Sequence, residues 1–97
     1  MEARVVIVQI QPGKTEEAIG IYRDSVVSVA KQMQGFKAAY LLTDPDTGKG
    51  ISVTFWETKA DMTAGETSSY LQDQIAKFAA VFVEPPIVGH YDLSVQV

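Results

Sequence analysis

The sequence predicts a single α+β domain, over residues 1–97, whose elements follow the order β-α-β-β-α-β. Three observations predict this fold class. Four short segments are apolar or alternate between apolar and polar residues, two longer segments carry apolar residues at helical spacing, and turn-forming residues separate them. This order is that of the ferredoxin-like fold, an antiparallel sheet with both helices on one face. Right-handed connections place the first and third strands at its centre and the second and fourth at its edges.

The first strand is predicted over Arg4–Ile10 because apolar residues occupy both of its alternating faces, as in a central strand that is covered on both sides. Gln11-Pro12-Gly13 ends this strand. A helix follows from about Glu16 to Gln34, with Thr15 as its N-cap and Gly35 as a residue suited to its C-cap. One apolar stripe runs along this helix: Ile19, Tyr22, Val26, Val29, Ala30 and Met33.

The second and third strands are predicted to form a hairpin. Residues 36–43 form one strand, and residues 44–50 are dense in turn-forming types. Thr58, with Asp61 three residues later, resembles a capping box and predicts a short helix, which Gly65 is expected to interrupt. The third strand alternates cleanly between two faces, one with Ile51, Val53 and Phe55, the other with Ser52, Thr54 and Trp56.

The second main helix is predicted from a 4-3-4 apolar spacing, and Pro85-Pro86 ends it. The last strand is predicted over about Ile87–Val97. Because both helices lie on one face, the opposite face of the sheet stays open and apolar, which is an aggregation hazard unless something covers it. The economical solution is a homodimer in which two sheets pack face to face. The 4-3-4 residues are Leu71, Ile75, Phe78 and Phe82, and the apolar face of the last strand carries Tyr91, Leu93, Val95 and Val97.

Composition excludes several classes of protein. Eight Lys and Arg against twelve Asp and Glu give a net charge of -4, and the cations are scattered, so nucleic acid is not an expected partner. The absence of cysteine excludes disulfides, thiolate metal sites and a Cys nucleophile, and a single histidine excludes a multi-His metal site while leaving one axial haem ligand conceivable. The first residues lack signal-peptide features, and no apolar run approaches the roughly 20 residues that span a membrane. We therefore expect a cytoplasmic protein that does not contact membranes.

Several motifs together resemble one family. They are similar to those of the antibiotic-biosynthesis-monooxygenase-like proteins, which belong to the dimeric α+β barrel superfamily. The resemblance covers essentially the whole chain and implies that fold and a homodimer. The motifs are Gly35-Phe36, Leu41-Leu42-Thr43-Asp44-Pro45-Asp46, Phe55-Trp56-Glu57-Thr58, and Pro85-Pro86 before Gly89-His90-Tyr91.

The resemblance also implies a ligand pocket between the sheet and the helices of each subunit. Some members oxygenate anthrone or quinol-type polyketides with O₂ and with neither metal nor flavin, so no cofactor is expected. Their pocket is lined by a tryptophan on the third strand, which Trp56 matches, whereas Ser52 stands for their asparagine and Met62 for their tyrosine. Haem-degrading members carry a second tryptophan and a histidine after this strand. This chain has neither there, so haem degradation is not expected.

The third strand supplies the first candidates for a site. If the match of Trp56 holds, Ser52, Thr54 and Trp56 face the helices and line the pocket. Two hydroxyls beside an indole are unexpected on a central strand and suit a flat, oxygenated ligand. Trp56 Nε1–H is then the catalytic candidate, as a donor to a substrate or peroxide oxygen, and Ser52 or Thr54 would hold a carbonyl. In the alternative, Trp56 packs at the top of the core and both hydroxyls bind backbone or water.

Aromatic residues of the two helices are the next candidates for the pocket. Tyr22 lies on the buried stripe of the first helix, Tyr70 opens the second, and Phe78 belongs to the apolar stripe of the second. These positions suit the core as well as a binding site. Residues 62–69 are small, polar and interrupted by glycine, so they form either a mobile lid over the pocket or simply a loop.

Histidine is the only side chain whose ordinary pKa lies near neutrality, so His90 is a candidate acid or base. It alternates with Asp92, Ser94 and Gln96, as on a solvated face or a dimer contact. Three functions stay open. The chain is a cofactor-independent oxygenase of a small aromatic or quinol, a non-catalytic protein that binds a small hydrophobic metabolite, or an isomerase or lyase with His90 or a tyrosine as base. Met62 in place of the tyrosine favours the second over the first.

Overall fold

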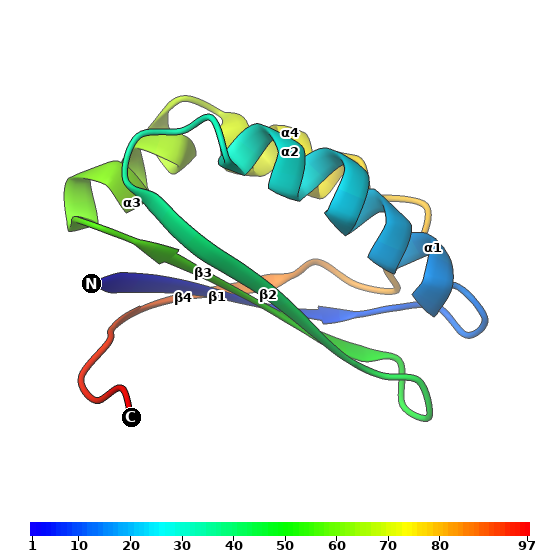
Figure 1. Cartoon of the computed structure of the whole chain (residues 1–97). Coiled ribbons are helices and arrows are strands. Elements are labelled where there is room, and N and C mark those ends of the chain that lie inside the picture. Colours follow the sequence, from blue (N-terminus) through cyan, green and yellow to red (C-terminus); the bar gives the residue numbers. More distant parts are fainter.

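The computed structural model describes residues 1–97 and consists of a four-stranded sheet with all its helices on one face (Figure 1). The predicted β-α-β-β-α-β order is confirmed, and each of the two predicted helical regions is divided into shorter segments. In chain order the elements are β1 (Glu2–Gln9), α1 (Thr15–Ile21), the π-helical turn η1 (Tyr22–Val26), α2 (Val27–Ala30), β2 (Phe36–Asp44), β3 (Lys49–Trp56), α3 (Lys59–Thr67), α4 (Tyr70–Ala76) and β4 (Ile87–Asp92).

The sheet has the strand order β2-β3-β1-β4, and every neighbouring pair is antiparallel. The predicted placement of the first and third strands at the centre is therefore confirmed. Val6 of β1 lies opposite Ser52 of β3 on one side and opposite Val88 of β4 on the other. Directly opposed residues of a sheet point to the same face, so these three side chains form one row beneath the helices.

The core lies between the sheet and the helices. On β1 the residues Arg4, Val6 and Val8 are buried on the helix side, and on β3 the predicted split of faces is confirmed because Thr54 and Trp56 are buried there too. Each fully buried Val, Ile or Phe contributes about 1.5–3 kcal/mol of hydrophobic stabilisation. The central apolar cluster consists of Val6, Val8, Ile10, Ala18, Tyr22, Phe78 and Val81.

The first helical region ends earlier than predicted. Regular helix ends at Ala30, and residues 31–34 continue in turns in which N–H groups donate three residues back, as from Met33 to the Ala30 carbonyl at 3.0 Å. Gly35 has the positive φ of 79° expected of a residue that ends a helix. Within the helix, η1 is a π turn, which the apolar spacing did not predict.

The second helical region also differs from the prediction in detail. Thr58 caps α3 as predicted, with its Oγ1 accepting from the Asp61 N–H at 3.1 Å. The predicted break at Gly65 is wrong, because α3 continues to Thr67 and the chain turns at Ser69, whose φ is 64°. A Cβ on Gly65 would lie 3.0 Å from the Tyr70 ring, so the glycine permits close packing of α3 on that ring. None of the helices has the length and apolar character that crossing a membrane requires.

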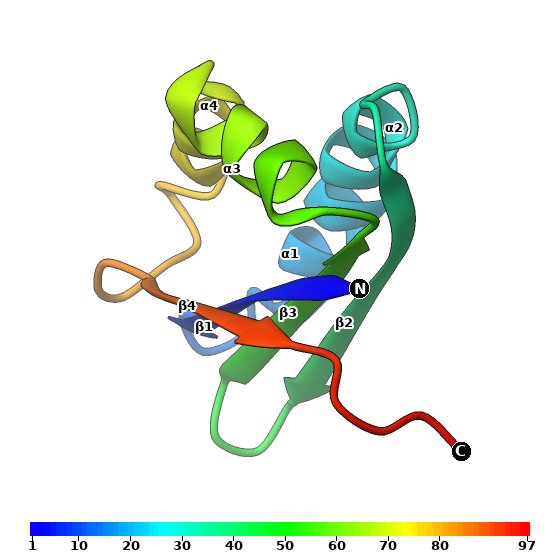
Figure 2. The ribbon, with the colours of Figure 1, turned by 90° about the vertical axis from the view of Figure 1, so that its left-hand side faces the viewer.

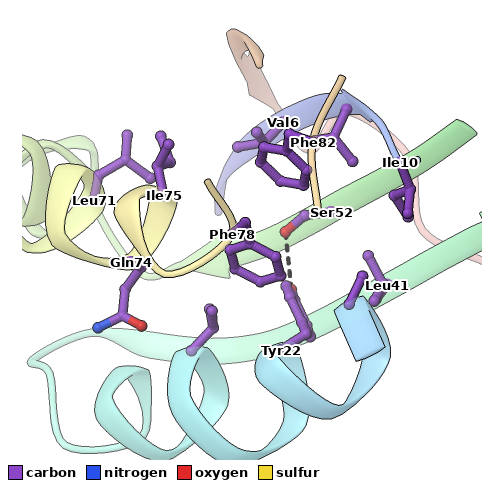
Figure 3. A pocket seen from close by; sticks show the side chains of 13 residues that line it. Val6, Ile10, Tyr22, Leu41, Ser52, Leu71, Gln74, Ile75, Phe78 and Phe82 are labelled. Atoms are coloured by element: carbon purple, nitrogen blue, oxygen red, sulfur yellow. Dashed lines mark hydrogen bonds between the residues drawn. The ribbon is translucent and has the colours of Figure 1, made fainter. Parts of the chain in front are cut away.

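The residues after α4 pack as turns. Phe78 and Phe82 were predicted on the second helix but follow its end at Ala76, because Phe82 pairs with Ile10 in an isolated bridge and Val83 N–H donates to the Gln9 carbonyl at 2.9 Å. These contacts with β1 pull the chain out of the helical path. Phe78 and Phe82 nevertheless point toward the sheet, as the apolar spacing predicts (Figure 3).

The last strand is shorter than the predicted segment, which extended to Val97. β4 ends at Asp92, and the last bond to β1 is the one from the Leu93 N–H to the Met1 carbonyl at 2.9 Å. Residues 93–97 form no strand. The C-terminal tail instead turns away from the helices, toward the other face of the sheet (Figure 2).

The face of the sheet opposite the helices is apolar and open. Tyr40 and Leu42 of β2 are each 57% exposed, and Ile87 and Tyr91 of β4 are 65% and 60% exposed. Tyr40 packs edge-on against Phe55 of β3, with ring centroids 6.1 Å apart. The expectation of an uncovered apolar face is therefore confirmed for one copy of the chain.

Candidate functional site

A cavity of about 70 Å³ lies between the sheet and the helices (Figure 3). Its walls come from β1, β2 and β3 below and from α1, η1, α4 and the turn after α4 above. Nearly all its lining is apolar, as in most ligand sites. The lining residues are Val6, Val8, Ile10, Ala18, Tyr22, Val26, Leu41, Ser52, Leu71, Gln74, Ile75, Phe78 and Phe82.

Simple periodicity positions these side chains. Ala18, Tyr22 and Val26 are four residues apart, so the first helical region presents them along one side. Leu71, Gln74 and Ile75 do the same from α4. The predicted stripes are confirmed only in part: they included Tyr22, Val26, Leu71 and Ile75, but neither Ala18 nor Gln74, and Val29 of the first predicted stripe is 38% exposed.

Tyr22 and Ser52 form the polar part of the cavity. Their hydroxyl oxygens are 2.9 Å apart, and the Tyr22 hydroxyl lies 3.3 Å from the Tyr40 carbonyl oxygen (Figure 3). Tyr22 has one proton, so both contacts are satisfied when Tyr22 donates to the carbonyl and Ser52 donates to Tyr22. Burial raises the pKa of Tyr22, while the Ser52 hydrogen bond and the Arg4 charge act in the opposite direction. The phenol is thus a neutral hydrogen-bond donor near pH 7.

Trp56 lies outside the cavity lining, in the wall at one end. It is fully buried, its Nε1–H donates to Thr54 Oγ1 at 3.0 Å, and its ring meets the ring of Phe36 edge-on at 5.5 Å. Thr54 occupies the row next to Ser52 on the same face of β3 and is also absent from the lining. The indole and hydroxyl therefore satisfy each other instead of pointing polar groups into the cavity.

Arg4 belongs to the same wall and was not singled out from the sequence. Its side chain is 2% exposed, its guanidinium carbon lies 5.5 Å from the centre of the Trp56 ring, and its Nη1 donates to the Met62 carbonyl oxygen at 3.1 Å. The same nitrogen lies 3.5 Å from Glu66 Oε2. The signal that could have found Arg4 is the alternation of β1, which places it on the face of Val6 and Val8.

The other predicted site residues take separate positions. Met62 is buried in α3 and contributes its carbonyl to Arg4, and Tyr70 donates from its hydroxyl to the Val26 carbonyl at 3.2 Å. Burial raises the pKa of Tyr70, against the influence of the Arg4 charge. His90 lies on the helix side of β4 and its Nε2 is 2.9 Å from Glu66 Oε2, with the side chain 41% exposed. The structure thus brings only Tyr22, Ser52 and Phe78 of the candidates to the cavity.

Gln74 is a second residue that the sequence did not reveal. It is buried, lines the cavity and accepts a hydrogen bond from Ser25 Oγ through its Oε1 at 3.1 Å. Lys77 Nζ donates to the same serine oxygen at 2.5 Å. These bonds join η1 to the end of α4, the two segments that form the upper walls of the cavity.

An outer groove of about 560 Å³ adjoins the cavity. It is bordered by α4 and by the segment from Ala79 to Val88, which includes both prolines of the Pro85-Pro86 pair. Ile75 and Phe82 line both the groove and the cavity. These two side chains therefore lie between the cavity and the groove. No three His, Asp or Glu side chains gather anywhere in the chain to form a metal site.

A family model of the antibiotic biosynthesis monooxygenases matches residues 1–77. No curated protein matches the chain. Among solved structures, one from Bordetella bronchiseptica that is assigned to these monooxygenases is 19% identical to this chain, with a TM-score of 0.81 over 97% of both chains.

Two further structures are similar in the same way. A monooxygenase of Streptomyces coelicolor in complex with nanaomycin D is 15% identical, with a TM-score of 0.78 over 99% of this chain and 89% of that one. A structure from Nitrosomonas europaea is 16% identical, with a TM-score of 0.76 over 93% and 86% of the two chains. At such identities the likeness establishes the fold, and the chemistry has to be argued from the cavity.

Proposed function

Because the chain belongs to the antibiotic biosynthesis monooxygenase family, we propose that it oxidises a small electron-rich aromatic or quinol-type compound with O₂. The observation that carries this proposal is the apolar cavity between sheet and helices, in which Tyr22 and Ser52 form the one hydroxyl pair. Opened toward the outer groove, such a site would hold a flat ring, keep water away and offer hydrogen bonds to an oxygen of the ring.

In the proposed reaction, a CH₂ group of an anthrone-like ring system becomes a carbonyl. Loss of one proton gives an enolate, which transfers electrons to O₂ and forms a carbon–oxygen bond, and the peroxide oxygen takes up a proton. Removal of the second hydrogen as a proton breaks the O–O bond. One oxygen stays on carbon and the other leaves as water, so CH₂ and O₂ give C=O and H₂O. The substrate supplies all four electrons.

Tyr22 and Ser52 would act on the substrate oxygen that becomes negative in the enolate. Once Tyr22 gives up its bond to the Tyr40 carbonyl, its phenol, which stays protonated near pH 7, donates a hydrogen bond to this oxygen without transferring its proton completely, which stabilises the anion in an apolar site. Trp56 and Thr54, which bind each other, would hold the end wall in place. A direct catalytic contact of Trp56 with the substrate would require this bond to open.

A second candidate function is the binding of a small hydrophobic metabolite without turnover. Met62, which stands where the oxygenases have a tyrosine, favours it, because this residue is buried and offers no side-chain hydroxyl. At about 70 Å³, roughly half the ~150 Å³ of an engineered cavity that holds benzene, the cavity has to open before it admits a ring under either function. No contact supports His90 as the base of an isomerase or lyase, because it binds Glu66 outside the cavity lining.

Both candidate functions require a route into the cavity. Phe82 borders the cavity and the outer groove, so displacement of its ring would join the two spaces. We place substrate access there. The joined space is then large enough for a ring system of two or three fused rings.

We also propose that two copies form a homodimer through the open faces of their sheets. Four large apolar side chains that are more than half exposed lie on this face, and the fold leaves it without any helix to cover it. The hydrophobic effect supports this homodimer, because contiguous apolar surface of this kind is uncommon on a monomer. The side chains are Tyr40, Leu42, Ile87 and Tyr91.

The experiment that tests the oxygenase is O₂ uptake by the purified, metal-free protein across a panel of anthrones, hydroquinones and catechols. Tyr22→Phe and Ser52→Ala remove the cavity hydroxyls, and Trp56→Phe changes the wall. We expect turnover with at least one compound and a loss of about tenfold or more in kcat/KM for Tyr22→Phe. Saturable binding of panel members without O₂ uptake would support the binding protein instead.

A further inference from the structure

The guanidinium of Arg4 has one edge that makes no hydrogen bond. Its side chain is 2% exposed, and Nη1 makes both of its polar contacts, with the Met62 carbonyl and with Glu66. The remaining donors, Nε–H and the Nη2–H beside it, point in a common direction and have no partner. No fully enclosed side-chain nitrogen or oxygen in the chain lacks a partner, so these two nitrogens retain accessible surface.

The charge of Arg4 is only partly compensated. Arginine is always protonated in proteins, and its one acidic neighbour, Glu66, is reached at 3.5 Å, at the outer limit of a hydrogen bond. The same carboxylate lies closer to His90, at 2.9 and 3.0 Å from Nε2. A buried cation with such a long contact gains most from an additional anion.

Arg4 also lies directly beside the cavity. It is opposite Thr54 in the sheet, and the adjacent row on the same face is Val6 opposite Ser52, both of which line the cavity. Two residues along a strand span about 6.8 Å, so the rows are neighbours. In addition, the Arg4 charge opposes the effect of burial on the pKa of Tyr22, a lining residue.

We propose that the cavity, once displacement of the Phe82 ring joins it to the outer groove, takes an aromatic carboxylate, with the ring among the apolar side chains and the carboxylate on the free Nε and Nη2 edge of Arg4, one row of the sheet beyond the lining. A planar guanidinium edge with two parallel N–H groups matches the two oxygens of a carboxylate. Arg4 is then the residue that sets specificity for an acidic substrate. The inference rests on the proposed use of the cavity as a substrate site and adds the class of substrate.

The test compares benzoate with benzamide, which have nearly the same shape but differ in charge. Trp56 is the only tryptophan, and its single indole N–H signal in an NMR spectrum of the full-length ¹⁵N-labelled protein reports on the wall beside Arg4. We expect benzoate to bind the wild-type protein at least about tenfold more tightly than benzamide. Arg4→Met should remove this preference, and Arg4→Lys should keep only part of it, because an ammonium lacks the paired donors.

Lys37→Met is the matched control, since it removes one positive charge from an exposed lysine that pairs with Glu57 away from the cavity. It should leave the preference for benzoate unchanged. If Arg4→Met does not fold, the ratio of the benzoate and benzamide affinities, measured for the wild-type protein and for Arg4→Lys, still tests the proposal. Equal affinity of the wild-type protein for both compounds, or no binding of benzoate at millimolar concentration, overturns the proposal.

The outcomes also separate this inference from the oxygenase itself. Arg4-dependent binding of benzoate without O₂ uptake on any compound would sustain the acidic ligand and reject the oxygenase. The opposite result would be turnover of neutral anthrones with an unchanged kcat/KM in Arg4→Met, together with equal binding of benzoate and benzamide. It would sustain the oxygenase and reject the acidic ligand.

Discussion

The rings of Phe78 and Phe82 stack with their centroids 5.1 Å apart and their planes 10° from parallel. Both rings line the cavity, and Phe82 also borders the outer groove. Because the stack lies in the turns that follow α4, movement of one ring does not have to unwind a helix. We therefore expect the Phe82 ring to be displaced, as the proposed route into the cavity requires, with the helices intact.

Phe82→Leu should accelerate exchange of an apolar ligand with the cavity. The smaller side chain loses the stacking contact and leaves a wider connection to the groove, at a cost of about 1 kcal/mol in the free energy of unfolding. Exchange of toluene, measured from NMR line broadening, should become several-fold faster. Phe36→Leu is the control, because Phe36 packs on Trp56 and does not line the cavity. Equal rates in all three proteins would refute a gate at Phe82.

The stability of the fold should decrease in alkali. Burial raises the pKa of Tyr22 and of Tyr70 above the ordinary value of 10.0. Below pH 10 both the folded and the unfolded chain keep these protons. As the pH rises from 10 toward the raised pKa values, the unfolded chain loses protons that the folded chain retains, so the free energy of unfolding falls.

Urea unfolding at about pH 8 and about pH 10.5 measures this loss. Tyr22→Phe should show a smaller decrease than the wild-type protein, because one of the two retained protons is gone. Tyr70→Phe, which removes the other buried phenol, should also show a smaller decrease than the wild-type protein. A decrease in Tyr22→Phe equal to that of the wild type would contradict the burial argument.

Two helical glycines should respond to alanine in opposite directions. At Gly20 of α1 nothing lies within 4 Å of an added Cβ, so Gly20→Ala should stabilise the protein by about 0.5–1 kcal/mol through helix propensity. At Gly65 of α3 the new Cβ would lie 3.0 Å from the Tyr70 ring, which a hydrogen bond to the Val26 carbonyl holds in place. Gly65→Ala should therefore destabilise by about 1 kcal/mol. Chemical denaturation checks both signs.

Charge on the open face of the sheet should break the proposed homodimer. Leu42→Glu places a carboxylate among Tyr40 and its apolar neighbours, and burial of this charge against a second copy would be costly. Sedimentation should show a dimer for the wild type and a monomer for the variant at micromolar concentration. Lys31→Glu, in the exposed turn after α2 on the helix side, should leave the dimer intact. A folded wild-type monomer under these conditions would disprove the interface.

Much of the fold was accessible from sequence patterns. The alternation of β3 predicted which residues face the helices, Thr58 predicted the start of α3, and the motifs around Trp56 identified the family. These features depend on local periodicity and capping. The ends of α4 and β4 depend on tertiary contacts, namely the bridge of Ile10 with Phe82 and the last bond from Leu93 to Met1, which periodicity does not contain.

The site was less accessible for a related reason. The sequence shows which face Trp56 belongs to but not whether its indole reaches an empty space or closes on Thr54. Arg4 lies at the beginning of an apolar strand, where a single charged residue ordinarily marks the end of the strand. Only packing against α3 reveals that its charge is buried beside Met62 and Glu66.

The π turn at Tyr22–Val26 sets the phase of the first helical region. The Val27 N–H donates to the Tyr22 carbonyl, five residues back, so this turn contains one residue more than an α turn. Each residue of an α-helix rotates the chain by about 100° about the helix axis. The extra residue therefore shifts by one position the sequence spacing that keeps side chains before and after the turn on the same face. Loss of Asp24 alone would leave the Val27 N–H bonded to the Tyr22 carbonyl four residues back, as in a regular α-helix, so Ala30, which is fully buried, would keep its orientation. This segment should therefore tolerate a single-residue deletion that would rotate the buried face of an ordinary helix.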